Sequence, residues 1–380
     1  MTKKVFAVSD NIISSLGFTT GENFNNIKSN VSGIKKISDN DIYIEPFMAS
    51  VVDSNLLDNN FFNIDNADNY TRFEKLMILS INDALKNINI DLQSDRTIFI
   101  ISTTKGNIDV FDEQKKIKFG AERIKLWSVA KILQNFYKLK HTPLLISNAC
   151  ISGILAIINA QRLLSCGKFD NAIVVGADIV SKFVVSGFMS FKSISNKICK
   201  PFDKNRDGLS LGEGSSTLVL STNENIVKNK ITIDFGASSN DANHISGPSR
   251  TGEGLYLAIK KVVKKTNLPI DYISAHGTAT LYNDDMESKA IVRNNLQNTP
   301  VNSFKGYFGH TLGMAGVLET ILTIKSMQDN LLINTFGFKE LGTAEQINVI
   351  NKTVKADLKT CIKIGSGFGG CNAALLISKN

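Results

Sequence analysis

One stretch of the sequence decides the fold, and it reads Leu144-Leu145-Ile146-Ser147-Asn148-Ala149-Cys150-Ile151-Ser152-Gly153. Its first three residues form a short apolar run that is typical of a buried strand, and an apolar helix is predicted from Cys150 onwards. The small residues Ala149, Ser152 and Gly153 leave room for backbone and substrate to approach. We interpret the stretch as a strand, a turn and a helix that present Cys150 as a nucleophile. The positive end of the helix dipole is expected to favour its thiolate form.

Strands and helices alternate along the rest of the chain. Apolar runs predict strands at 5–8, 97–101, 144–146, 171–175, 216–221, 230–235 and 272–275, with a further strand near 301 and final strands around 362 and 373–378. Helical spacing predicts helices at 69–87, 119–139, 254–265, 285–294 and 313–327, whereas 9–17 is expected to be a loop. This alternation indicates an α/β fold with sheets buried between helices. A similar order of elements in 1–222 and 223–380 suggests two duplicated halves, the first with the nucleophile.

Length and composition narrow the class of protein. The chain has 380 residues, 43% of them hydrophobic and 21% charged, as in ordinary soluble proteins. Its five cysteines form no CxxC pair, which argues against a metal site and favours the reducing cytoplasm. No apolar run is long enough for a membrane span or a signal peptide. The net charge of +8 comes from scattered lysines, which do not predict nucleic-acid binding but suit an acidic protein partner.

A single cysteine in an apolar helix is more often structural than catalytic, so further evidence is needed. Two of the four histidines supply it, because each follows a predicted strand among glycines. They are His276, in Ser-Ala-His-Gly-Thr-Ala-Thr, and His310, in Lys-Gly-Tyr-Phe-Gly-His-Thr-Leu-Gly. Strand ends are where α/β proteins bind ligands. His141 and His244 lack this context and are interpreted as structural or surface residues.

Two more segments stand out. A charged loop, Pro201-Phe202-Asp203-Lys204-Asn205-Arg206-Asp207-Gly208, precedes Leu211-Gly212-Glu213-Gly214. A glycine-dense turn, Gly365-Ser366-Gly367-Phe368-Gly369-Gly370-Cys371-Asn372, lies near the C-terminus. The turn lacks the Lys-Ser/Thr ending of a phosphate-binding P-loop, so nucleotide binding is not expected.

The order of these motifs resembles the β-ketoacyl-acyl-carrier-protein synthases, in the elongating group with a Cys-His-His triad. The resemblance implies the thiolase-like fold, in which two duplicated halves build five layers (αβαβα), and members are usually dimers. It also implies a decarboxylating Claisen condensation of an acyl-enzyme with malonyl-acyl-carrier-protein. No cofactor or metal is expected, because the phosphopantetheine arrives on the carrier protein.

The resemblance assigns a role to individual residues. Cys150 is the acyl-accepting nucleophile, and His276 and His310 bind the malonyl thioester carbonyl. Lys305 supports the histidine pair and Glu319 is its partner, either as an organising ion pair or in catalysis. The backbone N–H groups of Cys150 and Phe368 match the oxyanion hole, and Phe368 also matches the gate. The predicted substrate-binding residues are Thr278, Thr280, Phe188 and Phe202, while Asp203, Arg206, Asp207 and Glu213 are expected to shape the loop.

Departures from the family pattern bear on the pathway. The Gly-Thr-Pro-x-Gly-Asp that usually follows the first histidine is here Ala279-Thr280-Leu281-Tyr282-Asn283-Asp284, and Ser366 replaces an aromatic residue. They leave open fatty-acid synthesis and a specialised polyene or polyketide pathway, as a homodimer or as a heterodimer with a homologous subunit.

The sequence is also compatible with two functions other than that of a condensing enzyme. One is a chain-length-determining or structural subunit, whose members usually lack the nucleophile. The other is a thiolase acting on coenzyme A thioesters, for which Cys371 would be the second cysteine. For a carrier protein, the positive charges of Arg72, Lys75, Lys115, Lys116 and Lys118 are the candidate contacts.

Overall fold

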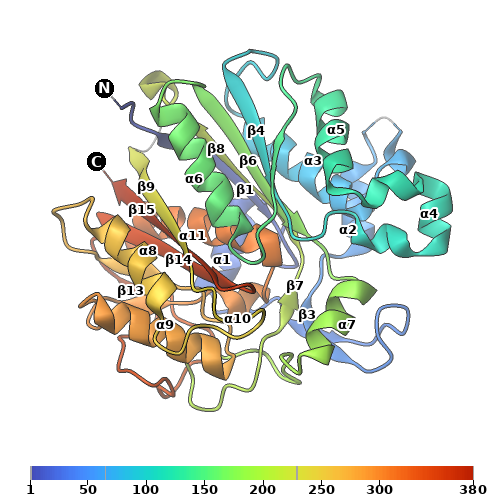
Figure 1. Ribbon diagram of the computed structural model, residues 1–380. Helices are drawn as coiled ribbons and strands as arrows, with labels where there is room; N and C mark the ends of the chain where they lie inside the picture. Colours follow the sequence, from blue (N-terminus) through green and yellow to red (C-terminus); the bar gives the residue numbers. More distant parts are fainter. Residues whose placement is uncertain (1, 65, 228–229, 380) are drawn as a thin grey trace.

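A computed structural model describes residues 2–64, 66–227 and 230–379, and within them ten strands form one twisted sheet (Figure 1). The first half of the chain supplies β1 (Phe6–Ile13), β4 (Thr97–Ser102), β5 (Leu144–Ile146), β6 (Asn171–Asp178) and β8 (Gly214–Ser221). The second half supplies β9 (Ile231–Asn240), β10 (Tyr272–Ser274), β11 (Val301–Asn302), β14 (Thr360–Gly367) and β15 (Cys371–Lys379). Most of their residues are buried, which explains why they appear in the sequence as apolar runs.

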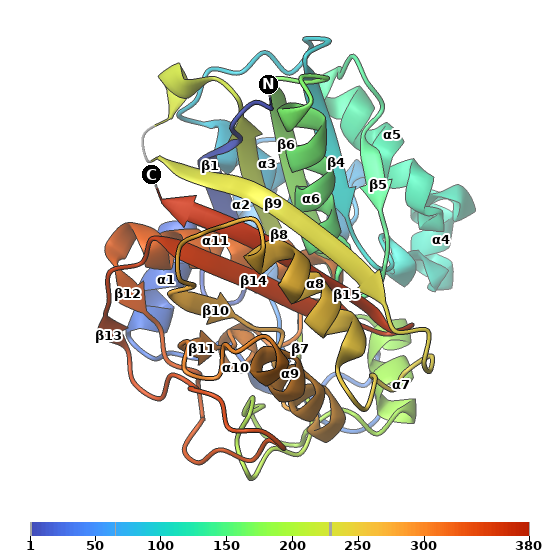
Figure 2. The same ribbon diagram turned by 60° about the vertical axis from the view of Figure 1, so that its left-hand side comes forward.

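The two halves have the same strand order. The first runs β5-β4-β6-β8-β1 and the second runs β11-β10-β14-β15-β9. Numbered within each half, both orders are third, second, fourth, fifth and first strand. The halves meet where Phe6 of β1 pairs with Thr232 of β9, as Figure 2 allows the reader to follow. This repetition of topology is what the similar order of elements in the sequence suggested.

Helices cover both half-sheets and fill the space between them. The central layer is α6 (Ser152–Ser165) with α11 (Ala315–Asp329), which share the largest apolar cluster with strands of both halves. The first half-sheet is covered on its outer face by α3 (Arg72–Leu85) and α5 (Leu126–Tyr137). The second is covered by α8 (Glu253–Val263) and α9 (Leu281–Arg293). These five layers confirm the predicted thiolase-like fold class.

Glycines allow the two central helices to approach closely. A Cβ on Gly153 would lie 2.7 Å from the backbone nitrogen of Val317, and one on Gly316 would lie 2.3 Å from that of Ile154. No side chain larger than hydrogen fits there without moving backbone. Because α6 begins just after Cys150, this contact also fixes the nucleophile against the half of the chain that carries the histidines.

The remaining helices and strands are short. They include α1 (Thr20–Lys28), α2 (Ser54–Phe61), α4 (Glu113–Phe119), α7 (Lys182–Ser190) and α10 (Lys305–Phe308). Short strands are β2 (Lys35–Ile37), β3 (Phe47–Ser50), β7 (Leu211–Gly212), β12 (Leu331–Leu332) and β13 (Val354–Lys355). Two predictions were wrong here. Residues 9–13 continue β1, and the helix expected at 119–139 begins only at Leu126, because the backbone of Lys125 before it is extended.

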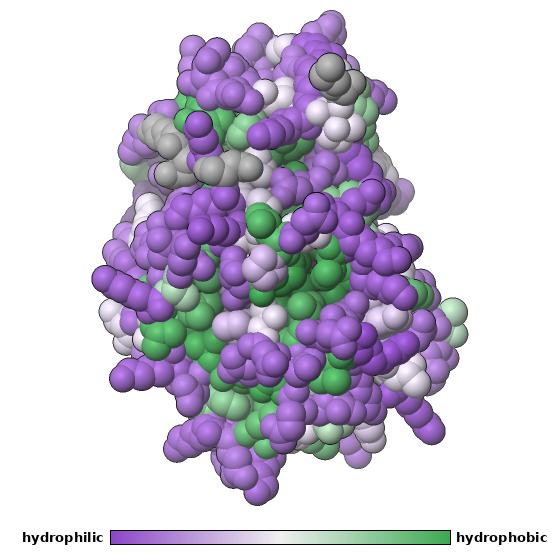
Figure 3. Space-filling model, turned by 90° about the vertical axis from the view of Figure 1, so that its left-hand side faces the viewer, coloured by the Kyte–Doolittle hydropathy of each residue, from purple (hydrophilic) through white to green (hydrophobic). Residues whose placement is uncertain are grey.

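The surface is mixed in character. On the face shown in Figure 3, hydrophobic residues gather near the middle and hydrophilic residues surround them. No helix in the described part of the chain combines the length and the apolar character that crossing a bilayer requires.

Candidate active site

Cys150 lies in the tight turn between β5 and α6. Ala149, directly before it, has a φ of 43°, a left-handed conformation that is strained for a residue with a side chain. Ser152 stabilises the turn, since its hydroxyl accepts from the Asn148 N–H at 2.8 Å and donates to the Ala149 carbonyl at 2.6 Å. The helix begins at Ser152 and not at Cys150 as predicted. Cys150 therefore lies on the turn itself, with its sulfur directed at the second half of the chain.

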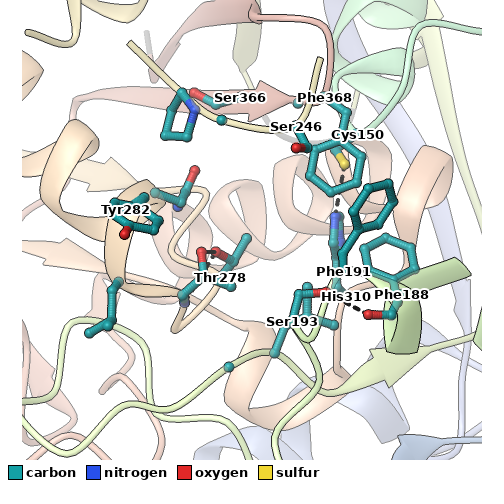
Figure 4. Close-up of a pocket in the computed structure, with 18 of the residues that line it drawn as sticks. Cys150, Phe188, Phe191, Ser193, Ser246, Thr278, Tyr282, His310, Ser366 and Phe368 are labelled. Atoms are coloured by element: carbon teal, nitrogen blue, oxygen red, sulfur yellow. Dashed lines mark hydrogen bonds between the residues drawn. The ribbon is translucent and has the colours of Figure 1, made fainter. Parts of the chain in front are cut away.

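His310 meets this sulfur from the opposite half. Its Nε2 lies 3.0 Å from the Cys150 Sγ, the contact drawn in Figure 4. Its Nδ1 accepts the Leu312 backbone N–H at 3.3 Å, so in the neutral ring the proton is on Nε2. The Phe368 backbone N–H also hydrogen-bonds the sulfur. Two N–H donors thus face Cys150, an arrangement that stabilises negative charge on sulfur or on a bound acyl oxygen.

His276 completes the triad. It follows β10, and its ring lies edge-to-face with that of His310, with centroids 5.1 Å apart and planes at 85°. Lys305 Nζ lies 3.3 Å from His276 Nδ1 and donates to the His276 carbonyl at 2.6 Å and to Glu319 at 2.7 Å. With Nδ1 facing an ammonium donor, the neutral His276 ring also carries its proton on Nε2.

Burial controls the protonation of the triad. It lowers the pKa of both His276 and His310 well below the usual range, and the positive charge of Lys305 lowers each further. Both rings are therefore neutral at pH 7. Burial raises the pKa of the Cys150 thiol to about 12, and the nearby Cys371 adds to this rise. The expectation that the helix dipole yields a thiolate in the free site was wrong, because desolvation outweighs the favourable donors.

The triad opens into a cavity of about 440 Å³. Thr278 and Thr280 line one side, and their hydroxyls are 2.8 Å apart. Phe188 and Phe191 line another side and pack against Phe368, with ring centroids 5.8 and 5.3 Å away (Figure 4). A cavity of this size with an apolar wall and a few polar groups suits a small organic ligand.

Phe202 is placed differently from the prediction. It is fully buried in the core beneath α8 and α9 and is not among the residues that line the cavity. Its ring lies against Gly277, where an added Cβ would come within 2.8 Å of it. Phe202 thus supports the turn after His276 from behind and does not contact substrate from this position. Cys371 also lies outside the lining, and its sulfur contacts the Phe368 carbonyl at 3.3 Å.

Sequence reasoning missed several residues of the site besides Phe191. His244 and Ser246 line the cavity, although they belong to a turn that resembles ordinary surface. Buried Asp178 bonds the Gly313 N–H at 2.7 Å and thereby anchors the segment after His310. Buried Lys363 contacts Glu319 at 2.7 Å. Asp178 ends one apolar strand and Lys363 interrupts another. A charged residue within an apolar run was the sequence signal that could have found them, because such a residue is rarely buried without a partner.

The charged loop shapes the wall, as expected. Asp203 accepts the backbone N–H groups of Asn205, Lys339 and Glu340. Arg206 donates to the Gly342 carbonyl at 2.6 Å and to Asp285 at 2.8 Å. Glu213 accepts the N–H groups of Val52 and Val180 and pairs with Arg72. Asp207 accepts from Ser195 at 2.6 Å. These contacts join neighbouring loops. None of the four charged side chains contacts the Cys150 sulfur in the described part of the chain.

A metal ion could be held among the described residues by Cys150, His276 and His310, whose ligand atoms lie within 4.8 Å of one another. Such an ion would fill the position that a thioester must take. The expectation that the site uses no metal or cofactor stays a prediction.

Comparison with known proteins identifies the family. The N-terminal domain of the beta-ketoacyl synthases matches residues 3–225, and their C-terminal domain matches residues 231–339. The chain belongs to the β-ketoacyl synthase family.

Relatives of this synthase are found in fungi and bacteria. A protein of Schizosaccharomyces pombe, named as a mitochondrial 3-oxoacyl-[acyl-carrier-protein] synthase, is 32% identical over 81% of each chain. The 3-oxoacyl-[acyl-carrier-protein] synthase homolog of Saccharomyces cerevisiae is 29% identical over 100% of this chain and 99% of its own. Among solved structures, the ketosynthase ApeO with its chain length factor ApeC from Xenorhabdus doucetiae matches with a TM-score of 0.87 and 24% identity, covering 100% of this chain and 98% of that chain. This last likeness concerns the fold.

Proposed function

We propose that this synthase joins an acyl group held on Cys150 to a malonyl thioester held on a carrier protein, with loss of carbon dioxide. The observation that carries the proposal is the meeting of the Cys150 sulfur with two neutral histidines in one cavity, the nearer at 3.0 Å. Each histidine presents an N–H and neither presents a positive charge. Such a pair stabilises an enolate as it forms and does not protonate it.

Acyl transfer comes first. The Cys150 sulfur attacks the thioester carbonyl of the acyl carrier, a new carbon–sulfur bond forms, and the carrier thiol leaves with the proton that Cys150 held. Because burial raises the pKa of this thiol to about 12, the proton is best passed to the departing thiolate during the exchange. The backbone N–H groups of Cys150 and Phe368 stabilise the tetrahedral oxyanion, by about 3 kcal/mol for each donor.

Decarboxylation follows when a malonyl thioester enters. Its thioester oxygen accepts the Nε2–H groups of His276 and His310, the bond to the carboxylate breaks, and the electron pair moves into the enolate. The enolate carbon then attacks the acyl carbonyl on Cys150. Collapse of that adduct releases the thiolate of Cys150, which is reprotonated, and leaves a β-ketoacyl thioester on the carrier.

The residues that line the cavity support the proposed class of substrate. The hydroxyls of Thr278 and Thr280 offer hydrogen bonds to the amides of a phosphopantetheine arm, and the phenylalanine wall suits an apolar acyl chain. The pathway is either fatty-acid synthesis or a specialised polyene or polyketide pathway. The five free cysteines support a reducing compartment, and we place the synthase in the cytoplasm.

The basic residues predicted to contact the carrier protein differ in how far their charges are already paired within the chain. Arg72 is committed to buried Glu213, so we withdraw it as a contact. Lys75, Lys115 and Lys118 line a surface hollow of about 210 Å³. Within this group Lys75 pairs with Asp58, Lys115 with Asp109 and Lys116 with Glu113, so Lys118 alone of the four has no ion pair among the described residues. Lys192, which was not predicted, lies at the rim of the catalytic cavity. Reversing the charge of Lys192 should raise the KM for the carrier-bound substrate, and an unchanged KM would remove it from the docking surface.

A second copy of a similar chain would fit beside β5. Among the described strands, β5 pairs only with β4, so one of its edges is open. Leu144 of β5 is 41% exposed and Trp127 of the adjacent α5 is 53% exposed. Open apolar edges are avoided in monomers, and we propose that a partner subunit covers this one. Light scattering on the purified chain should give twice the chain mass for a homodimer. Copurification of the chain with a homologous subunit would instead indicate a heterodimer.

Intact mass spectrometry tests the reaction. The wild type incubated with acyl carriers of several chain lengths should gain one acyl group, and Cys150→Ala should gain none. Addition of malonyl carrier should discharge the adduct and release carbon dioxide. If Cys150→Ala condenses as well as the wild type, the proposal fails. If no carrier acylates the wild type, the chain-length-determining alternative takes its place.

A further inference from the structure

Lys363 is a charged residue in the middle of a buried strand. It belongs to β14, and its side chain has no exposed surface. Its ammonium faces four acceptors, which are the carbonyls of Ser274 at 3.2 Å, Ala275 at 3.0 Å and Ile364 at 2.7 Å and the Glu319 carboxylate at 2.7 Å. A lysine this deeply buried is rare unless its charge is paired, and here the pairing is with Glu319.

Lys363 and Lys305 share one carboxylate. Glu319 Oε1 lies 2.7 Å from Lys305 and Glu319 Oε2 lies 2.7 Å from Lys363. The two lysines also hold the carbonyls of three consecutive residues, 274 to 276, because Lys305 bonds the His276 carbonyl. The end of β10 and the histidine that follows it are thus fixed from two directions.

A second cation is not required to neutralise Glu319. Lys305 already provides one positive charge, so Lys305, Glu319 and Lys363 together carry an excess of one whenever the nearby Glu287 is protonated. Burying an uncompensated charge is costly, and an apolar side chain at position 363 would pack in the strand without that cost. The excess therefore suggests a use beyond the stability of the sheet.

We propose that Lys363 is a positioning residue for the condensation, the second cation of a Lys305–Glu319–Lys363 clamp that holds His276 in place and keeps both histidines uncharged. The proposal rests on the proposed function for its catalytic consequence. Its geometric part concerns the histidines alone.

The charges around the histidines agree with this role. Burial and Lys305 lower the pKa of His276 and of His310, and Lys363 is a further cause for both. Besides the clamp's own Lys305 from α10 and Glu319 from α11, titratable groups packed against it include Glu287 from α9, Tyr272 from β10 and Cys199. Glu287 accepts the backbone N–H of His276 at 2.7 Å. When ionised, its negative charge favours a protonated histidine, and removal of Lys363 takes away a positive charge that opposes this effect.

The test compares Lys363→Met and Lys363→Gln with the wild type. Both remove the charge, and the glutamine can still donate hydrogen bonds to the strand carbonyls. The sequence has only four histidines, so nitrogen-15 labelling of histidine gives a simple NMR titration. In both variants the pKa of His276 and His310 should rise above the wild-type value, because a positive charge that lowers it is gone. The acid limb of decarboxylation against pH should move upward by the same amount, with kcat reduced about tenfold and KM little changed.

Lys379→Met is the matched control. Lys379 lies on β15, where its ammonium bonds the Met327 carbonyl at 2.9 Å, and its removal should leave the histidine titration unchanged. Lys363→Arg keeps the charge and should keep the wild-type histidine titration, although its larger head group will lower kcat. Folded neutral variants with wild-type histidine pKa values would overturn the proposal. If neither neutral variant folds, a shifted histidine titration in Lys363→Arg would overturn it. A wild type without decarboxylase activity would instead contradict the proposed function and leave the titration readable.

Discussion

Asp178 offers a quantitative test of how the nucleophile and His310 are held together. It closes β6, is 1% exposed, and receives hydrogen bonds from the segments after both β4 and His310. Its Oδ1 accepts the Thr103 hydroxyl at 2.8 Å, and its Oδ2 accepts the backbone N–H groups of Thr104 at 2.9 Å and Gly313 at 2.7 Å. Burial raises the pKa of this carboxyl, and the hydrogen bonds oppose the rise.

The size of the effect follows from what each substitution leaves unsatisfied. Asp178→Ala leaves the backbone N–H groups of Thr104, Lys105 and Gly313 without this acceptor, at about 1–3 kcal/mol for each that is buried. We therefore expect it to lower the free energy of unfolding by roughly 3–5 kcal/mol. Asp178→Asn keeps one oxygen, which is best placed toward Gly313, and the Thr103 hydroxyl can rotate to accept from the new amide. Its expected loss is about 1–3 kcal/mol.

The assay is urea unfolding at a fixed protein concentration, followed by circular dichroism, with kcat measured on the same samples. Asp357→Asn is the control, because Asp357 pairs with Lys359 where both side chains are exposed, and it should contribute less than about 1 kcal/mol. Because Gly313 is three residues from His310, kcat should fall in the order wild type, Asn, Ala. An alanine variant as stable as the Asp357→Asn control would refute the reasoning.

Three further predictions concern packing and pH. Gly153→Ala forces a Cβ to within 2.7 Å of the Val317 backbone nitrogen and should destabilise the fold by about 1–3 kcal/mol in urea unfolding, whereas Gly187→Ala, which meets open space on α7, should not destabilise it. Alkylation of Cys150 by iodoacetamide should accelerate continuously between pH 7 and 9, because burial raises its pKa to about 12, and a plateau below pH 8 would contradict this. Burial raises the pKa of Glu287 from 4.5 to about 7, so its contribution to stability is complete below pH 4.5 and is lost as the pH rises through 7. Glu287→Gln should therefore flatten the fall of unfolding free energy over this range, and an unchanged slope would count against the shift.

The sequence predicted the elements whose pattern is local. Apolar runs located the strands of both halves, and the glycine-rich contexts of His276 and His310 pointed to one site although the two residues are 34 positions apart in the chain. Helical spacing also located α3, which runs from Arg72 to Leu85 where 69–87 was expected.

Properties that arise from tertiary contact could not be predicted in this way. Residues 9–13 look polar, yet Asn11 is fully buried because the strand pairs with β8. The helix dipole suggested a thiolate at Cys150, but burial of the sulfur, which no local pattern reports, reverses the direction of the pKa shift. The family resemblance made Phe202, which belongs to the charged loop, a predicted substrate contact, and only the fold places it behind Gly277.

The distribution of charge around the site matches the reaction that it is proposed to catalyse. Both the enolate and the acyl oxyanion carry negative charge, and the enolate is proposed to form in front of the neutral histidines. Behind the histidines, Lys305 and Lys363 outnumber Glu319, and the pKa of Glu287, which is raised to about 7, makes its own negative charge easy to lose. A positive excess placed behind the neutral rings favours negative charge in front of them in a low-dielectric site. A cation in direct contact with the enolate could do the same, but a charged imidazole would also protonate the carbon that must attack. Two neutral donors backed by buried lysines stabilise the enolate and preserve its reactivity as a nucleophile.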